Sequence, residues 1–177
     1  MYDLSSFRVR LDTTRARTYQ APTLNGLFQK GPRSDHRPDL AQVKIMLRRK
    51  DPLGWERTTE VVDGSFASDP LYEPVIEKVR ATLNCSGVLY VGDTKMAATQ
   101  TVANVANNKD CYLVPLPVTQ VPQEVLVTIL EPVMDGSQHL TEVYRELPNG
   151  SSKKIAEGYE FTETRTVEIN EQISNEG

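Results

Sequence analysis

Alternating apolar and polar residues predict a β-strand near the start of the chain. Phe7, Val9 and Leu11 alternate with polar residues, and this period of two is typical of a half-buried strand. The pattern places Asp12 at the end of the strand, on the face opposite the apolar residues. Asp12 is therefore the first candidate for a functional carboxylate.

Two further strands are predicted in the next forty residues or so. Val43, Ile45 and Leu47 are the apolar positions of a strand that alternates with Gln42, Lys44 and Met46. A turn at residues 51–54, with the sequence Asp-Pro-Leu-Gly, leads into a weaker strand over residues 55–62. Short connections of this kind imply that the three strands form an antiparallel meander.

The period changes to that of a helix after the Asp-Gly turn at residues 63–64. Asp69 as N-cap and Pro70 at the first helical position are typical of a helix start. The apolar residues that share one helical face are Tyr72, Val75, Ile76, Val79 and Leu83. We expect this face to pack on the sheet.

A short apolar run over residues 88–91 predicts a buried strand that ends at Gly92. Asp93 follows directly, before a second, alanine-rich helix whose inward positions are Ala98, Val102, Val105 and Ala106. A further strand is expected over residues 111–116. Ligands of α/β folds bind outside the carboxyl ends of strands, so Asp93 is the second candidate carboxylate.

The pattern changes again after Pro117. A strand is expected over residues 125–130, and an Asn-Gly hairpin turn at residues 149–150 separates strands over 140–147 and 155–169. The predicted domains are therefore residues 1–117, a partial catalytic core, and residues 118–177, a β-rich insertion.

The predicted element order is three antiparallel strands, helix, strand, helix and strand. This order matches an α/β, ribonuclease-H-like mixed sheet, in which carboxylates on the first and fourth strands lie next to each other. Mg²⁺ takes carboxylate and phosphate oxygens as ligands, and two ions about 4 Å apart can promote phosphodiester chemistry. Asp12 and Asp93 are the candidate ligands, although isolated Asp residues at strand ends are often only caps or turn residues.

The distribution of charge suggests a partner for the first segment. Residues 1–50 contain 11 Lys and Arg against 4 Asp and Glu, although the whole chain has a net charge of -4. A basic segment of this kind favours contact with nucleic-acid phosphates, to which Arg15 and Arg17 could contribute. A solvated basic face without a partner is the alternative.

The remaining composition excludes several classes of protein. No apolar run approaches the length of a membrane span, and the first ten residues have no signal-peptide core. Cys85 and Cys111 are isolated from each other and from histidines, so neither a disulfide framework nor a zinc site is indicated. We expect a cytoplasmic protein with no membrane partner.

Three other polar residues could contact phosphate. His36 and Arg37 lie in a polar loop, and Lys95 follows Asp93 by two positions. A structural hydrogen-bonding turn is the more common role for a residue such as His36. A solvated lysine in the first turn of a helix explains Lys95 equally well. His139 has no partner in the sequence and is interpreted as a surface residue.

Several longer strings resemble insertion-sequence transposases of the DDE superfamily, in the branch with a β-rich insertion between the second Asp and the Glu. They are SDHRPDLAQVKIML (34–47), DGSFASDPLYEPVIEKVR (63–80), LYVGDTKMAATQT (89–101) and CYLVPLP (111–117). The resemblance implies Asp12 and Asp93 as catalytic, metal-binding residues with Mg²⁺ or Mn²⁺. It also implies transposon-end DNA as partner and, in full-length relatives, a homodimer.

The sequence departs from that family in two places. Members have a DNA-binding region before the first strand, whereas Asp12 lies near the start of this chain. Members also carry a helix with the spaced residues Tyr, Arg, Glu and Lys, and the sequence after Tyr144-Arg145 does not fit it. The third carboxylate is therefore expected beyond residue 177, which makes the chain a truncated fragment that is inactive alone.

Two alternatives remain. The string VGDTKMAATQTVANVANN resembles the last motif of haloacid-dehalogenase-like phosphatases, but Ala97 and Thr14 stand where that family has acids. A non-catalytic, β-rich interaction module would retain the fold without the chemistry. Metal binding that depends on Asp93 distinguishes the transposase interpretation from the inert module.

Overall fold

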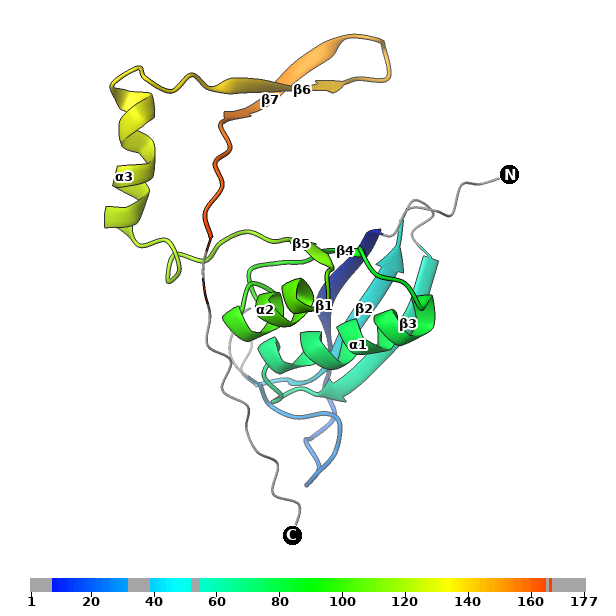
Figure 1. The fold of residues 1–177 in the computed structure, drawn as a ribbon. Helices are drawn as coiled ribbons and strands as arrows, with labels where there is room; N and C mark the ends of the chain where they lie inside the picture. The colour runs from blue at the N-terminus through cyan, green and yellow to red at the C-terminus, as the bar shows by residue number, and fades with distance from the viewer. Residues whose placement is uncertain (1–7, 32–38, 52–54, 165, 167–177) are drawn as a thin grey trace. The chain divides into compact units, whose positions relative to one another are not determined.

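The computed structural model describes residues 8–31, 39–51, 55–164 and 166, and its secondary structure follows the chain in a simple order (Figure 1). The described chain divides into two compact units between Leu116 and Pro117. The elements of the first unit are β1 (Arg8–Thr18), β2 (Ala41–Lys50), β3 (Trp55–Asp63), a 3₁₀ turn (Asp69–Leu71), α1 (Tyr72–Leu83), β4 (Leu89–Val91), α2 (Thr99–Asn107) and β5 (Cys111–Leu113). The elements of the second are α3 (Gln123–Met134), β6 (Thr141–Glu146) and β7 (Ser152–Gly158).

The first unit contains a five-stranded mixed sheet in the order β3-β2-β1-β4-β5. Strand β1 pairs antiparallel with β2 and parallel with β4, β2 pairs antiparallel with β3, and β4 pairs parallel with β5. The predicted order of three antiparallel strands, helix, strand, helix and strand is confirmed. Strand β1 is therefore central, with neighbours on both sides.

Helices α1 and α2 pack on the same face of this sheet (Figure 1). The core cluster joins Val9 and Leu11 of β1 and Tyr90 of β4 to the apolar residues of both helices. The predicted apolar face of α1 is confirmed, since the helix residues that are buried are Tyr72, Val75, Ile76 and Val79. The core consequently lies between the helices and one side of the sheet.

The burial of β2 differs in phase from the prediction. Met46 and Lys44 are almost fully buried on the side of the helices, whereas Ile45 and Leu47 are only half-buried. The Lys44 ammonium donates to the carbonyl of Phe66, so the charge leaves the apolar layer although the side-chain stem stays inside it. The sequence pattern was wrong here because long cationic side chains can occupy core positions when a carbonyl meets their charged end.

Asp12 lies within β1 and not at its end, because the strand continues to Thr18. Its predicted orientation is confirmed: Val9 and Leu11 are buried, and Asp12, which lies on the opposite face of the strand, is exposed.

The second helix begins at Thr99, and its buried residues are Thr101 and Val105. Among the described residues, none of the helices has the length and apolarity that a membrane span needs.

The second unit begins with a helix where the sequence pattern predicted a strand. Residues 125–130, which are rich in Val, Leu and Ile, form the middle of α3. The predicted hairpin is present, with β6 and β7 antiparallel, but β7 ends at Gly158 instead of continuing to residue 169. The second unit therefore contains a helix followed by a hairpin, and the predicted strand over residues 125–130 was wrong.

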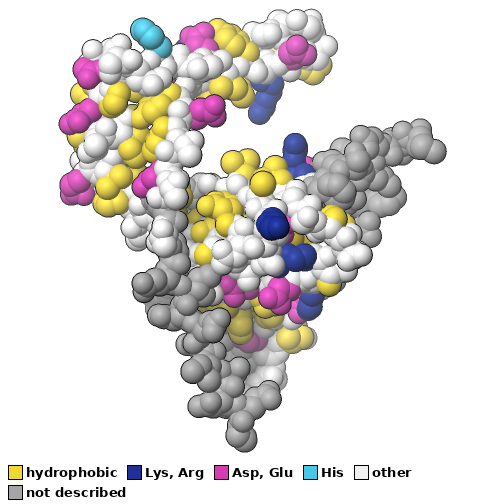
Figure 2. Space-filling model, in the orientation of Figure 1, with side chains coloured by type: hydrophobic (Ala, Val, Ile, Leu, Met, Phe, Trp, Pro, Cys, Tyr) yellow, Lys and Arg dark blue, Asp and Glu magenta, His cyan; other side chains and the backbone are white. Residues whose placement is uncertain are grey.

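Helix α3 buries none of its residues in the described structure. Its exposed apolar residues are Val125, Leu126, Val127, Leu130 and Met134. Figure 2 shows hydrophobic side chains gathered on the surface of this unit. The hydroxyl of Tyr159 donates to the carbonyl of Ile129, which ties the segment after β7 to the helix.

Candidate metal centre

The two candidate carboxylates lie at corresponding positions of neighbouring parallel segments, Asp12 within β1 and Asp93 just after β4. Arg8 pairs with Leu89 and Arg10 pairs with Val91. Asp12 and Asp93 each lie two residues beyond the last of these pairs. One acid of β1 and one of the turn after β4 therefore lie at corresponding positions of neighbouring segments.

Three donors converge on one oxygen of Asp93. The Tyr72 hydroxyl donates to Oδ1 at 2.7 Å, the Lys95 backbone N–H donates to it at 2.9 Å, and the Met96 backbone N–H at 3.4 Å. The other carboxylate oxygen, Oδ2, accepts no hydrogen bond from the residues that the structure describes. Oδ1 is thus committed to the protein, and Oδ2 is available to a ligand.

Tyr72 of α1 forms a hydrogen bond with Asp93. Its side chain is fully buried in the core, and its hydroxyl reaches the sheet edge where Asp93 lies. Burial raises the pKa of Tyr72 well above its usual range, and the hydrogen bond to Asp93 and the charges of Asp93 and Asp12 raise it further, against the hydrogen bond with Thr13. The phenol therefore keeps its proton and acts as a donor, and both carboxylates lie close enough to influence it.

The backbone between β4 and α2 shapes this edge. At Gly92 a side-chain Cβ would lie 2.5 Å from the sulfur of Met96 and 2.8 Å from its Cβ. Only glycine fits where the chain passes so close to the fully buried Met96. Gly92 thus allows the tight turn in which the backbone N–H groups reach Oδ1 of Asp93.

The carboxylate oxygens of Asp12 and Asp93 fit a hard divalent cation that takes only some of its ligands from the protein. Mg²⁺ keeps several waters and is commonly held by one or two carboxylates together with substrate phosphate oxygens. Asp12 is exposed and makes no hydrogen bond or ion pair with the described residues, so its carboxylate is also available. In the described part of the chain, no group of three or more His, Cys, Asp or Glu residues could hold a metal ion.

The residues predicted to contact phosphate have different positions. Arg15 and Arg17 lie in the second half of β1, beyond Asp12. Lys95 is exposed in the turn after β4, and its backbone N–H already serves Asp93. His36 and Arg37 lie outside the described residues. His139 is exposed, in line with its interpretation as a surface residue.

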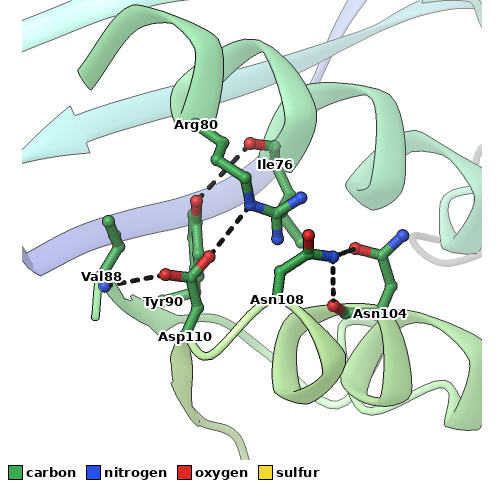
Figure 3. A network of polar contacts seen from close by, with 7 residues as sticks. All are labelled: Ile76, Arg80, Val88, Tyr90, Asn104, Asn108 and Asp110. Carbon is green, nitrogen blue, oxygen red and sulfur yellow. Dashed lines mark hydrogen bonds and ion pairs between the residues drawn. The ribbon is translucent and has the colours of Figure 1, made fainter. Parts of the chain in front are cut away.

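A buried ion pair fixes the strand that precedes Asp93. The carboxylate of Asp110 accepts from Arg80 Nε of α1 at 3.1 Å and from the Val88 backbone N–H at 3.0 Å. Figure 3 shows the Arg80 side chain extending from α1 to Asp110, near the Tyr90 hydroxyl, which donates to the Ile76 carbonyl. One carboxylate therefore holds the start of β4, the start of β5 and the end of α1 together.

The sequence pattern could not identify Tyr72 as part of this edge. Tyr72 was predicted only as one of several core residues on the apolar face of α1. The contact joins residues from different elements, and nothing in the local pattern separates a tyrosine that ends at a carboxylate from one that ends at a carbonyl. The order of elements, by contrast, was sufficient to predict that β1 and β4 are neighbouring strands.

Comparisons with known proteins give a distant likeness. No protein-family model and no curated protein matches the chain. A cryo-EM structure of a piggyBac transposase synaptic complex with hairpin DNA is similar, with a TM-score of 0.43, 12% identity, and coverage of 77% of this chain and 28% of that chain. The crystal structure of the Mos1 strand transfer complex has a TM-score of 0.41 and 8% identity, and covers 72% of this chain and 41% of that chain. The chain thus spans less than half the length of either structure, and likeness at this level does not establish a shared activity.

Proposed function

We propose that the chain is part of the catalytic core of a DDE-superfamily DNA transposase and that it binds Mg²⁺ or Mn²⁺ through Asp12 and Asp93. The observation that carries the proposal is the shared register of β1 and β4, which brings these two acids to one sheet edge. The mixed sheet with strand order β3-β2-β1-β4-β5, and two helices packed on it, supports the ribonuclease-H-like fold that the sequence resemblance implies.

The hydrogen bonds of Asp93 support a role as a metal ligand over a purely structural role. Asp93 differs from the turn residues Asp63 and Asp135 because its Oδ1 accepts from the Tyr72 hydroxyl of another element as well as from local backbone N–H groups. Divalent ions at this edge would supply activation of an attacking hydroxyl and stabilisation of a leaving phosphodiester oxygen. The part of the protein is to hold the two carboxylates in place and to admit the DNA backbone.

A third carboxylate is expected from outside the described residues, because the described part of the chain offers none at this edge. Loss of one electrostatic contact at a reacting centre costs about 10²-fold to 10³-fold in rate. The chain alone is therefore expected to bind the ion and to cleave DNA much more slowly than a complete transposase. Cleavage by the chain at the rate of a complete enzyme would contradict this view.

Isothermal titration calorimetry with Mg²⁺ and Mn²⁺ tests the site directly. Binding by the whole chain that is lost in both Asp12→Ala and Asp93→Ala supports the proposal. Asp135→Ala is the matched control, because the Asp135 carboxylate also accepts from a backbone N–H two residues further on but lies in the second unit. If wild type does not bind, or if all three variants bind equally well, the proposed function is wrong.

DNA is the partner that the proposal implies for Arg15 and Arg17 in the second half of β1. We expect binding of double-stranded DNA that weakens steeply as salt increases, because Lys and Arg release counterions from phosphates. Arg15→Ala with Arg17→Ala should weaken this binding. Lys153→Ala in β7 is the control, since Lys153 is an exposed cation of the second unit. If the Lys153 variant loses as much DNA affinity as the variant with both arginines replaced, binding depends only on the overall charge of the chain.

A further inference from the structure

Tyr72 combines a fully buried side chain with a hydrogen bond to a charged carboxylate, and packing in the core does not require that bond. It is the first residue of α1, and its side chain is fully buried among the apolar residues that join the helices to the sheet. Its hydroxyl nevertheless ends at the charged carboxylate of Asp93. The side chain thus crosses the core and reaches the edge where the candidate metal ligands lie.

Tyr90 shows what a tyrosine with only a packing role does in the same core. It is equally buried, and its hydroxyl donates to the Ile76 carbonyl at 3.5 Å, a long neutral hydrogen bond. The hydrogen bond from Tyr72 to Asp93 is 2.7 Å long and has an ionised acceptor. Hydrogen bonds to charged groups are shorter and roughly twice as strong as neutral ones.

The three donors to Asp93 come from two independent parts of the chain. The backbone N–H groups of Lys95 and Met96 belong to the turn after β4, whereas the hydroxyl of Tyr72 belongs to α1. Two donors from the turn alone would allow the carboxylate to move with that turn. The third donor ties the carboxylate to the helix that is packed on the sheet, and with it to Asp12 on β1.

We propose that Tyr72 is a positioning residue for the metal centre, which fixes Oδ1 of Asp93 and thereby leaves Oδ2 directed to a divalent cation shared with Asp12. This inference rests on the proposed function, since it assigns a partner to the same site. Outer hydrogen-bond partners of metal ligands orient the ligand, and their loss typically costs about 10-fold to 100-fold in metal affinity.

The test compares Tyr72→Phe with Tyr90→Phe in the whole chain, by calorimetric titration with Mn²⁺. Each variant removes one buried hydroxyl from the same core and leaves the ring in place, so their effects on packing are matched. We expect Tyr72→Phe to bind Mn²⁺ about 10-fold to 100-fold more weakly than wild type, and Tyr90→Phe to bind it normally. Thermal unfolding of both variants without metal measures the structural cost separately.

The outcomes distinguish the inference from the proposed function. If wild type binds Mn²⁺ and Tyr72→Phe binds it equally well, the positioning role is wrong and the metal centre remains. If Tyr72→Phe and Tyr90→Phe lose affinity to the same extent, the effect is general destabilisation and the positioning role is also wrong. If neither wild type nor Asp93→Ala binds Mn²⁺, the proposed function is wrong, and the positioning role of Tyr72 is wrong as well.

A second measurement does not require Tyr72→Phe to fold. The chain has seven tyrosines, and incorporation of 3-fluorotyrosine gives each one a ¹⁹F resonance. Single Tyr→Phe variants at the other six positions assign their signals, and the Tyr72 signal follows by elimination. We expect Mg²⁺ to shift the Tyr72 resonance and to leave that of Tyr90 unchanged. No shift at Tyr72 under conditions where calorimetry detects binding would overturn the inference.

Discussion

Replacement of Asp110 by Ala should remove a large part of the stability of the first unit. Its carboxylate is fully buried and serves two donors at once, the Arg80 guanidinium and the Val88 backbone N–H. Among the residues that the structure describes, the Val88 N–H has no other acceptor. The substitution therefore leaves the buried Val88 N–H without an acceptor and removes the ion-pair partner of the mostly buried Arg80.

The magnitude follows from these two losses. A buried N–H without an acceptor costs about 1–3 kcal/mol, and a hydrogen bond to a charged group contributes about 1.5–3 kcal/mol. The Arg80 side chain is 23% exposed, so water restores part of its solvation and the lower end applies to its share. The expected loss for Asp110→Ala is about 2.5–4.5 kcal/mol, close to the loss of about 3–5 kcal/mol that is typical of a broken buried ion pair.

Asp110→Asn separates the two contributions. The amide oxygen can still accept from the Val88 N–H, whereas the charge that pairs with Arg80 is gone. We expect a loss of roughly half that of Asp110→Ala, about 1–2 kcal/mol. Combined with Arg80→Met, the Asn variant should lose less than the sum of the single changes, because neither partner is then left as an unpaired charge.

Urea unfolding followed by tryptophan fluorescence measures these changes. The chain has one Trp, which belongs to β3 of the first unit, so the signal reports on that unit. The midpoint should move to lower urea without a change in slope. A loss below about 1 kcal/mol for Asp110→Ala would refute the reasoning. Equal losses for the Ala and Asn variants would refute the share assigned to the Val88 N–H.

Three other predictions concern backbone geometry and pH. Gly92→Ala should cost about 1–3 kcal/mol in urea unfolding and weaken Mn²⁺ binding, because the new methyl group would overlap Met96. Lys109→Gly should stabilise the first unit by up to about 1 kcal/mol in the same assay, because Lys109 has a φ of 60° in the left-handed region; a loss of stability would contradict this. The hydrogen bond from Ser65 lowers the pKa of Asp63 in the folded state, so its stabilisation is present above the usual Asp pKa and is lost as pH falls through the folded value. The stability difference between wild type and Ser65→Ala in urea titrations should therefore shrink below about pH 4, and a constant difference would refute the assignment.

The part of the structure that depends on topology was predictable from the sequence. The parallel pairing of β1 with β4 follows from the order of the elements, and it places Asp12 and Asp93 at corresponding positions of neighbouring segments. Their role as a metal site stays a prediction. Tyr72 was predictable as a buried residue of α1 but not as a partner of Asp93. That contact depends on how α1 is placed over the sheet, which the helical period does not specify.

The errors have physical reasons that lie in tertiary context. In β2, the pattern rule treats Lys44 as an outward residue, but a carbonyl at the edge of the core accepts its charge. In α3, a run rich in β-branched residues over 125–130 favours a strand by local preference, and the chain forms a helix instead. Local propensity is a weak guide where neighbouring segments decide which conformation is stable.

The central place of β1 also sets the order in which the metal centre can be assembled. The pairing of β1 with β2 joins consecutive segments, whereas the pairing of β1 with β4 spans most of the first unit. Closing the longer loop costs more chain entropy and awaits the later part of the chain during synthesis. The meander of β1, β2 and β3 can therefore form first, and the two acids meet only when β4 docks. The proposed site would therefore be completed late in folding, after the antiparallel part of the sheet.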